Sequence, residues 1–478
     1  MHKLLILIFG LVIASCSQVT PPEACLPLPS KEQLAWHQME MNAFVHFTTN
    51  TFTDKEWGYG DESPAVFNPD TVNTDQWVSV LKETGFKGVI LTCKHHDGFC
   101  LWPSEYTDHT IAKSPYLNGN GNIVKQLRES CTAQDMKFGV YLSPWDRNRS
   151  DYGQPSYIEY YRNQLKELFN AYGPVFEMWF DGANGGDGYY GGAKEERRID
   201  KQKYYDWPTT LDLVREIQDD VIFFSDAGPG VRWCGNESGF VNETCWSTIT
   251  PDTLYAGKGG IEHLLSTGSE DGTAWLPAEV DVSIRPGWFY HASEDSLVKT
   301  ADELFDIYLT SVGRGALLLL NIPPDRRGVF HENDVASLKA FKAKLDETFS
   351  NNYAKDATIL ASNVRGGSSD YCATNLIDSN RDTYWCTDDN VIGSTIEVAL
   401  KHETQLNYLV LQEYIELGQR IKKFSVEVYQ NGNWKSIANA TTVGYKRILP
   451  LNGVKADKLR VVIEDAKACP VISTLGIY

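Results

Sequence analysis

One acidic residue, Asp181, stands where an apolar segment ends and a turn begins. The stretch WFDGANG, residues 179–185, places this carboxylate after apolar and aromatic residues and before glycines. A second acid, Glu237, lies in RWCGNESG, a stretch with the composition of a loop. Carboxylates accompanied by histidines and aromatic side chains suit glycoside cleavage, in which one carboxylate attacks the anomeric carbon and another acid protonates the leaving oxygen. Asp181 and Glu237 are therefore candidates for chemistry.

Other polar side chains follow the ends of predicted strands. In a barrel of alternating strands and helices, the reactive groups lie at the carboxyl ends of the strands. This rule adds residues that can bind sugar hydroxyls, namely His46, His95, His96, Tyr141 and Arg232. Adjacent side chains on a strand point to opposite faces, so we expect His95 and His96 not to bind one metal ion together, and we predict a site without metal. The sequence has neither a GxSxG elbow nor a Walker-type phosphate loop.

Eight short apolar segments are the predicted strands that would position these side chains. They alternate with amphipathic stretches, of which 74–86 and 156–173 are the clearest helices. This alternation indicates an α/β fold, a (β/α)8-like TIM barrel over residues 25–349. No clear helix separates the fifth from the sixth segment, so we expect an irregular barrel there. The predicted strands are 43–47, 88–94, 138–144, 176–181, 221–226, 245–249, 280–284 and 315–323.

The pattern changes near residue 350. Short segments of strand composition, separated by turn residues, continue to the last residue, and QNGNW at 430–434 predicts a hairpin. We therefore predict that residues 350–478 form a second, all-β domain, most simply a sandwich.

The composition and the first residues bear on the partners and on the location. The chain has 478 residues with 44 basic and 63 acidic side chains, a formal charge of −19, which argues against nucleic acid as a partner. Residues 1–16 have a basic start, a short apolar stretch and the ending IASC, which resembles the lipobox of bacterial lipoproteins. We predict an exported protein, periplasmic or on the outer surface, that meets a membrane only through a lipid anchor at Cys16.

Five stretches carry a specific family resemblance. FVHFTTNTFTDKEWGYG, CKHHDGFCLWPS, GVYLSPWD, EMWFDGANG and LLLLNIPPDRRG occur in this order between residues 35 and 350. Together they resemble the α-L-fucosidases of glycoside hydrolase family 29. The resemblance implies a (β/α)8-like catalytic domain followed by a β-sandwich, no cofactor for catalysis, and hydrolysis of fucosylated glycans with retention through a covalent fucosyl-enzyme.

The resemblance also implies roles for single residues. It makes Asp181 the nucleophile, and it makes Glu56 and Trp57 part of a loop that closes over the sugar. Arg232 resembles an arginine that follows the fifth strand. The C5 methyl of fucose calls for an apolar wall, for which Phe44, Trp179 and Trp288 are candidates. The residues that would hold the fucose hydroxyls or line their pocket are His46, His95, His96, Tyr141 and Trp179.

The general acid/base is less well defined by the resemblance. Glu237 resembles the acid of the subfamily that prefers α-1,3- and α-1,4-linked fucose on branched glycans, and residues 277–291 also resemble that subfamily. Glu56 and Glu243 are its rivals. Because Asp181 must be ionised and Glu237 protonated at the start, we expect the site to raise the pKa of Glu237 relative to that of Asp181.

These residues predict a retaining exo-α-L-fucosidase. The alternatives are an α-L-fucosidase of broader specificity, an exo-glycosidase acting on α-galactosides, and an inactive barrel that only binds glycans. In the second domain, LIDSNRDTYW at 376–385 resembles the discoidin or carbohydrate-binding sandwich family. We expect this domain mainly to brace the barrel, with sugar binding as a second hypothesis. A structural calcium ion fits its Asp-rich turn, although nothing in the sequence requires one.

Overall fold

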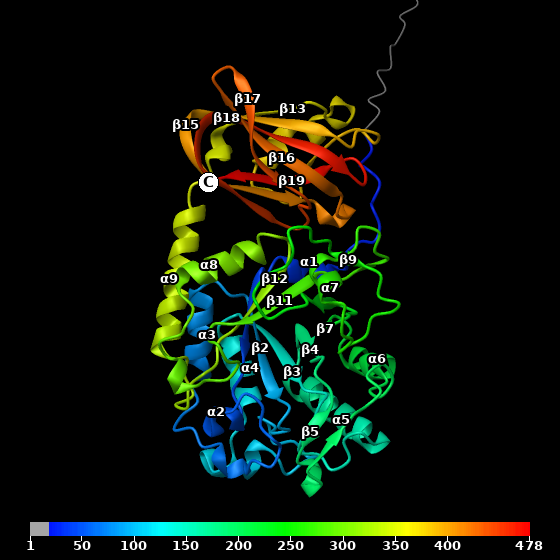
Figure 1. Ribbon diagram of the computed structural model, residues 1–478, viewed down its shortest axis with the longest axis vertical. Helices are drawn as coiled ribbons and strands as arrows, with labels where there is room; N and C mark the ends of the chain where they lie inside the picture. The colour runs from blue at the N-terminus through cyan, green and yellow to red at the C-terminus, as the bar shows by residue number, and fades with distance from the viewer. Residues whose placement is uncertain (1–18) are drawn as a thin grey trace, which may run out of the picture.

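Eight parallel strands close into a barrel in the computed structural model, which describes residues 19–478 (Figure 1). The predicted segment 1–16 lies outside the described residues. Around the barrel the strand order is β1-β12-β11-β8-β7-β4-β3-β2, and every neighbouring pair is parallel. The predicted TIM-like barrel is confirmed. Its strands are β1 (Met41–Val45), β2 (Gly88–Lys94), β3 (Lys137–Leu142), β4 (Glu177–Trp179), β7 (Ile222–Ser225), β8 (Val231–Trp233), β11 (Ala278–Ser283) and β12 (Leu317–Asn321).

Amphipathic helices cover the outside of the barrel. The longer ones, such as α3, α4, α5 and α8, each bury one largely apolar face. Local signals set their ends: a capping box of Thr300 and Glu303 starts α8, and Pro155 starts α5, which stops before Gly173. Within residues 19–478 none of the helices has the length and apolar character needed to cross a bilayer. The helices are α1 (Lys31–His37), α2 (Thr49–Thr53), α3 (Thr74–Glu83), α4 (Ile123–Ala133), α5 (Pro155–Tyr172), α6 (Trp207–Ile217), α7 (Glu262–Thr267), α8 (Ala301–Thr310) and α9 (Glu332–Phe349).

The sixth barrel strand differs from the prediction. The segment 245–249 does not enter the barrel, because its β9 (Thr248–Ile249) pairs antiparallel with β10 (Ala274–Trp275) outside it. The sixth strand is β8, which follows β7 after a turn of five residues and pairs with β7 and β11. Pairing with strands distant in sequence decides this assignment, and a three-residue strand carries too few side chains to show it locally. The barrel is irregular where we expected it to be.

A seven-stranded antiparallel sheet forms the second domain, which confirms the predicted all-β sandwich. The first half of β15 pairs with β13 and the second half with β19, so the long strand serves both parts of the domain. The predicted hairpin joins β16 to β17 through Asn431 and Gly432, whose φ values of 51° and 80° suit a two-residue turn. The strands are β13 (Thr358–Ala361), β14 (Trp385–Cys386), β15 (Ser394–Glu413), β16 (Ile421–Gln430), β17 (Asn433–Ala440), β18 (Arg447–Ala466) and β19 (Val471–Ile477).

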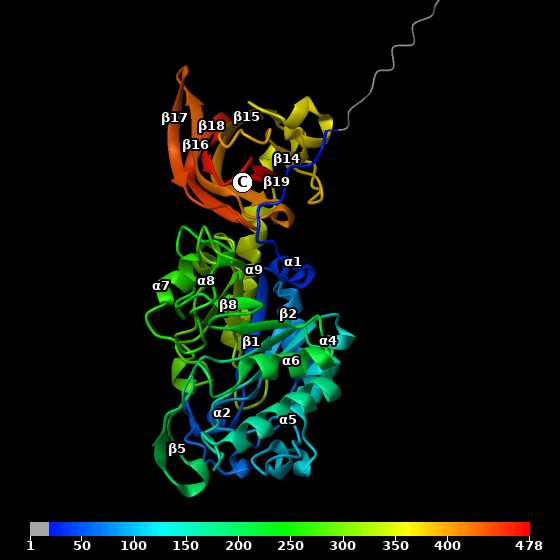
Figure 2. The same ribbon diagram turned by 90° about the vertical axis from the view of Figure 1, so that its right-hand side faces the viewer.

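The second domain is bonded to the loop segment that follows β8. Gln419 accepts a hydrogen bond from the Ser247 amide at 2.8 Å, and Thr442 accepts one from the Cys245 amide at 2.9 Å. The first described residues also cross this domain, where the Cys25 amide donates to the Leu417 carbonyl at 2.9 Å (Figure 2). The second domain is thus hydrogen-bonded to the barrel domain at residues 243–247.

Two glutamates face each other inside the barrel, below the carboxyl ends of its strands. Glu177 Oε2 accepts the indole N–H of Trp36 at 3.0 Å, and Glu279 Oε1 accepts that of Trp179 at 2.9 Å. The other oxygens, Glu177 Oε1 and Glu279 Oε2, are buried and have no hydrogen-bond partner within residues 19–478. The two acids are close enough for the charge of Glu177 to raise the pKa of Glu279. Burial raises the pKa of Glu177 to about 7 and that of Glu279 well above its usual range, so the pair holds a proton.

This pair makes the protein less stable as the pH rises. Folding raises both pKa values, so the folded state binds more protons than the unfolded state, and the free energy of unfolding falls as the pH rises from about 4.5 through about 7. Glu279→Gln replaces one of the two titrating acids by a neutral amide, so we expect the free energy of unfolding to depend less steeply on pH. Urea unfolding of wild type and variant at several pH values measures the slope. Equal slopes would contradict a protonated acid at this position.

Candidate active site

A cavity of about 410 Å³ opens at the carboxyl ends of the barrel strands. Its wall combines four carboxyl groups, three imidazoles and five large aromatic rings in addition to Tyr141, which is the mixture expected where a polar ring with one apolar face binds. The lining residues are Phe44, His46, Trp57, His95, His96, Tyr141, Trp179, Asp181, Gly182, Ala183, Asp226, Trp233, Glu237, Asp281 and Trp288.

Asp181 is held in place by two hydrogen bonds to its carboxylate. The residue lies two positions after the end of β4, and the Ala183 amide donates to its Oδ1 at 2.7 Å. The intervening residue, Gly182, has to be a glycine because a Cβ there would clash with the Asp226 carboxylate. The Tyr141 hydroxyl donates to Oδ2 at 2.9 Å from the neighbouring strand β3. Burial raises the pKa of Asp181, and these two bonds, which favour the anion, oppose that effect. The carboxylate is thereby oriented toward the cavity.

The three predicted histidines all line the cavity as neutral rings. Burial lowers the pKa of His46 and of His96 to about 3 and lowers that of His95 well below its usual range. The His46 Nδ1 lies 2.8 Å from Asn321 Oδ1, and the His96 Nδ1 lies 2.7 Å from the Ser143 hydroxyl. A neutral imidazole has one donor and one acceptor nitrogen, which suits a sugar hydroxyl.

The expectation that His95 and His96 point to opposite faces is wrong. Their ring centroids are 4.1 Å apart and both rings reach the cavity. The reason is that β2 ends at Lys94, so the two residues lie in a turn where the strand alternation no longer applies. Among residues 19–478, however, no group of three or more His, Cys, Asp or Glu side chains is arranged to hold a metal ion.

Glu237 reaches the cavity from the loop after β8. Its Oε2 accepts the indole N–H of Trp288 at 3.2 Å. Burial raises the pKa of Glu237, and the negative charges of Asp181 and Glu56 raise it further, whereas the Trp288 bond lowers it. A carboxyl group that faces another carboxylate is favoured in its protonated form, as the acid partner requires.

The two rival glutamates lie elsewhere in the described structure. Glu56 does not line the cavity, because its carboxylate accepts the Trp288 amide at 2.7 Å and the Phe289 amide at 3.2 Å and contacts His291 Nε2 at 2.7 Å. Glu243 lies at the boundary with the second domain, 3.6 Å from Arg314 and 3.9 Å from Arg447. Glu56 therefore holds the loop that carries Trp288 rather than facing the cavity.

Trp57 covers part of the cavity from the predicted closing loop. It is 52% exposed, and its ring meets His96 edge-on at 5.2 Å between centroids. Arg147 fixes this loop by donating to the Gly58 carbonyl at 2.7 Å. Together with Trp288, Trp57 narrows the entrance.

Arg232 does not line the cavity. The side chain is fully buried in β8, and its guanidinium donates to the Leu265 carbonyl at 2.7 Å, to the Trp246 carbonyl at 2.8 Å and to the Leu276 carbonyl. Arg232 thus joins the strand to the two segments packed behind it. The sequence placed Arg232 in the loop after the fifth strand, but it is the middle residue of β8 and its side chain points away from the cavity.

Two carboxyl groups of the cavity were missed from the sequence. Asp226 comes directly after β7, so the rule that reactive groups lie at strand ends pointed to it. Its Oδ2 accepts a hydrogen bond from the Gly257 amide at 2.7 Å, and burial raises the pKa of Asp226 to about 6. Asp281 sits within β11, where a charged residue in an apolar strand was the available signal. Trp233, the donor to Asp281, was missed as well.

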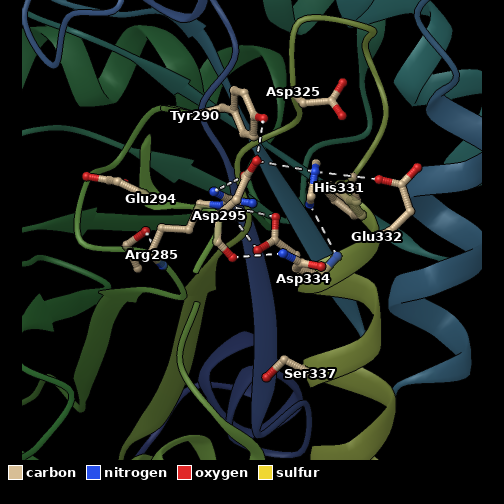
Figure 3. Close-up of polar contacts among 12 residues, drawn as sticks. Arg285, Tyr290, Glu294, Asp295, Asp325, His331, Glu332, Asp334 and Ser337 are labelled. Atoms are coloured by element: carbon tan, nitrogen blue, oxygen red, sulfur yellow. Dashed lines mark hydrogen bonds and ion pairs between the residues drawn. The ribbon is translucent and has the colours of Figure 1, made fainter. Parts of the chain in front are cut away.

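A buried ionic network secures the loop that carries Trp288. Arg285 donates to both carboxylate oxygens of Asp334 at 3.0 Å and to Asp295 at 3.0 Å, so it links the loop after β11 to the first turn of α9 (Figure 3). Asp295 also accepts the Tyr290 hydroxyl at 3.3 Å and lies 3.6 Å from His331. The wall of the cavity formed by this loop is therefore fixed from behind.

Comparisons with known proteins agree with this geometry. Residues 24–347 match the family described as alpha-L-fucosidase, and residues 358–473 match the F5/8 type C domain. Alpha-L-fucosidase 1 of Arabidopsis thaliana is 42% identical over 98% of this chain and 90% of its own length. A putative alpha-L-fucosidase structure from Bacteroides thetaiotaomicron is 39% identical with a TM-score of 0.87, covering 95% of this chain and 98% of the other. A Ruminococcus gnavus family 29 fucosidase in complex with fucose is 33% identical, with a TM-score of 0.87 and 96% of each chain covered.

The barrel and its carboxyl-lined cavity define the chain as a glycoside hydrolase. More narrowly, the chain belongs to the α-L-fucosidase family, glycoside hydrolase family 29, with a discoidin-like F5/8 type C domain after the barrel.

Replacing Arg232 tests whether it supports the fold or binds sugar. Arg232→Ala leaves three buried carbonyls without their donor, so we expect the free energy of unfolding to fall by about 3 kcal/mol or more. Arg232→Lys keeps the charge but cannot reach three acceptors, so it should recover only part of the loss. The KM of the folded variants for an aryl α-L-fucoside should stay within about twofold of wild type. A raised KM with unchanged stability would make Arg232 a substrate ligand instead.

Proposed function

We propose that the chain is an exo-α-L-fucosidase that removes terminal α-1,3- or α-1,4-linked L-fucose from branched oligosaccharides or glycoconjugates, with retention of configuration. The observation that carries the proposal is that Asp181 and Glu237 line one cavity in different surroundings. Asp181 receives two hydrogen bonds that favour its anion, whereas Glu237 receives one and faces the charge of Asp181. This difference divides the nucleophile from the acid.

In the proposed reaction Asp181 attacks the anomeric carbon of fucose while Glu237 gives its proton to the leaving oxygen. A covalent fucosyl-enzyme results; Glu237, now ionised, takes a proton from water, which attacks the same carbon and releases fucose with its original configuration. His46, His95 and His96 hold the hydroxyls as neutral partners. Phe44 and Trp179 supply the apolar face that the C5 methyl needs.

The linkage preference rests on the resemblance of the Glu237 loop and of residues 277–291 to the branched-linkage subfamily. Binding of the sugar itself is supported by the fucose in the Ruminococcus gnavus relative. The alternative of broader specificity predicts that an α-1,2-fucosyl lactose is cleaved as fast as a Lewis-type trisaccharide. The alternative of an inactive glycan-binding barrel predicts no turnover of an aryl α-L-fucoside.

Two variants assign the carboxyl groups. Asp181→Ala should abolish hydrolysis of every substrate, because no nucleophile is left. Glu237→Ala should lose about 100-fold more activity on a Lewis-type oligosaccharide than on an aryl fucoside, whose good leaving group needs little protonation. Azide should restore turnover by attacking the β-fucosyl-enzyme in place of water, which gives the α-fucosyl azide with retained configuration. Glu243→Ala is the matched control, with unchanged kinetics. Equal losses of Glu237→Ala on both substrates without azide rescue would reject the assignment.

The export of the protein is a separate proposal that rests on residues 1–16. We propose that the chain is lipid-anchored at Cys16 on the periplasmic or outer surface. The described chain begins three residues later, on the second domain, where Val19 and Thr20 accept hydrogen bonds from Tyr371 and Arg365. Cys16→Ser should move the protein from the membrane fraction to the soluble fraction and abolish labelling with a palmitate analogue. Persistent labelling would contradict the anchor site.

A further inference from the structure

Asp281 is a carboxyl group of the cavity that the proposed reaction does not use. It lies on β11 two residues beyond Glu279, whose side chain enters the barrel interior, and two residues before Ser283 at the end of the strand. Alternate residues of a strand point to the same side, so Asp281 also faces inward, one layer nearer the opening. It lines the cavity with only 3% of its surface exposed. Its place inside the barrel, one layer above Glu279, puts Asp281 at the closed end of the cavity, the floor.

The contacts of Asp281 come from a neutral donor and from no cation. Oδ1 accepts the indole N–H of Trp233 at 2.8 Å from the adjacent strand β8. Within residues 19–478 no lysine, arginine or histidine forms an ion pair with Asp281, and Oδ2 has no hydrogen-bond donor from the protein. The charged groups that act on it are Glu237 from the loop after β8 and Glu279 from its own strand.

A buried carboxyl group among other acids is most stable in its neutral form. Consistent with this surrounding, burial together with the charges of Glu237 and Glu279 raises the pKa of Asp281 well above its usual range. A neutral carboxyl group still accepts the Trp233 hydrogen bond on Oδ1, and it carries an O–H on the other oxygen. The side chain thus presents a hydrogen-bond donor to the cavity, whereas an aspartate in its usual ionised form would present only acceptors.

Such a donor suits the substrate. A sugar hydroxyl donates one hydrogen bond and accepts two, and an O–H on Asp281 adds a donor to those that the neutral imidazoles offer. An exo-acting pocket holds the terminal sugar at its closed end, so the group at the floor meets the fucosyl ring rather than the leaving group.

We propose that Asp281 binds the fucosyl ring as a neutral carboxylic acid, with its O–H donating to one ring hydroxyl and the Trp233 indole holding its other oxygen. The proposal rests on the proposed α-L-fucosidase activity and adds a binding residue to it. No proton is transferred, so Asp281 differs in role from Glu237. The contact also selects for the hydroxyl that accepts its hydrogen bond.

The experiment compares Asp281→Asn with Asp281→Ala on an aryl α-L-fucoside and on a Lewis-type trisaccharide. The amide of asparagine has nearly the same shape, accepts from Trp233 and donates through its NH₂ group, so Asp281→Asn should keep kcat/KM within about threefold of wild type. Asp281→Ala should lower kcat/KM by about 10- to 100-fold, equally on both substrates, because the contact is to the fucosyl ring that both substrates share. An Asn variant as impaired as Ala would overturn the proposal, because it would show that the carboxylate form is needed.

Monodeoxy substrates identify the contact itself. Wild type should discriminate against aryl fucosides that lack one of the ring hydroxyls, and Asp281→Ala should lose that discrimination at a single position while keeping it at the others. Unchanged discrimination at every position would reduce Asp281 to a structural residue and overturn the proposal. Urea unfolding of both variants separates lost stability from lost binding. Failure of the wild type to cleave the aryl fucoside would reject the proposed function instead, before any variant is compared.

Discussion

Burial of carboxyl groups without cations is the constraint on which this active site depends. Glu177 and Glu279 lie buried inside the barrel with raised pKa values, Asp281 lies one layer above Glu279, and Asp181 and Glu237 line the cavity. In so little water these acids cannot all be ionised, because each negative charge raises the pKa of its neighbours. The number of hydrogen bonds that each carboxyl group accepts then determines which of them stays ionised. Asp181 accepts two, more than the other acids that line the cavity, which fits the proposed role of an ionised nucleophile among neutral groups.

The same constraint explains why the walls of the cavity are tied so firmly. If the pKa of an acid depends on neighbouring groups, that pKa is constant only when the distances to those groups are fixed. The loop with Trp288 is held by Glu56 in front, by Asn321, which donates to the Trp288 carbonyl at 2.8 Å, and by the Arg285 network behind. The backbone that carries the Trp288 indole is therefore held at both its amide and its carbonyl, and the loop after β11 shapes the surroundings of Glu237.

Much of this could be predicted from the sequence, for identifiable reasons. Strands buried on both faces give continuous apolar segments, so seven of the eight barrel strands and the position of Asp181 were visible. The three-residue strand β8 was not, because its place is decided by pairing with distant strands. The same limit applies to side-chain direction: Arg232 lies where a ligand of the sugar was expected, yet its guanidinium turns to three carbonyls behind the barrel. Asp226 and Asp281 were readable as acids at strand ends or within strands, but only the fold shows that they meet in one cavity.

The contact between the second domain and residues 243–247 has a consequence for how such proteins diversify. The loop that carries Glu237 continues directly into the segment bonded to Thr442 and Gln419, so the discoidin-like domain helps to hold a loop that lines the cavity. Exchange of this domain for another sandwich during evolution would have to reproduce a hydroxyl and an amide at matching positions. The two domains are therefore expected to be inherited as one unit, with the specificity of the barrel and the surface of the sandwich changing together.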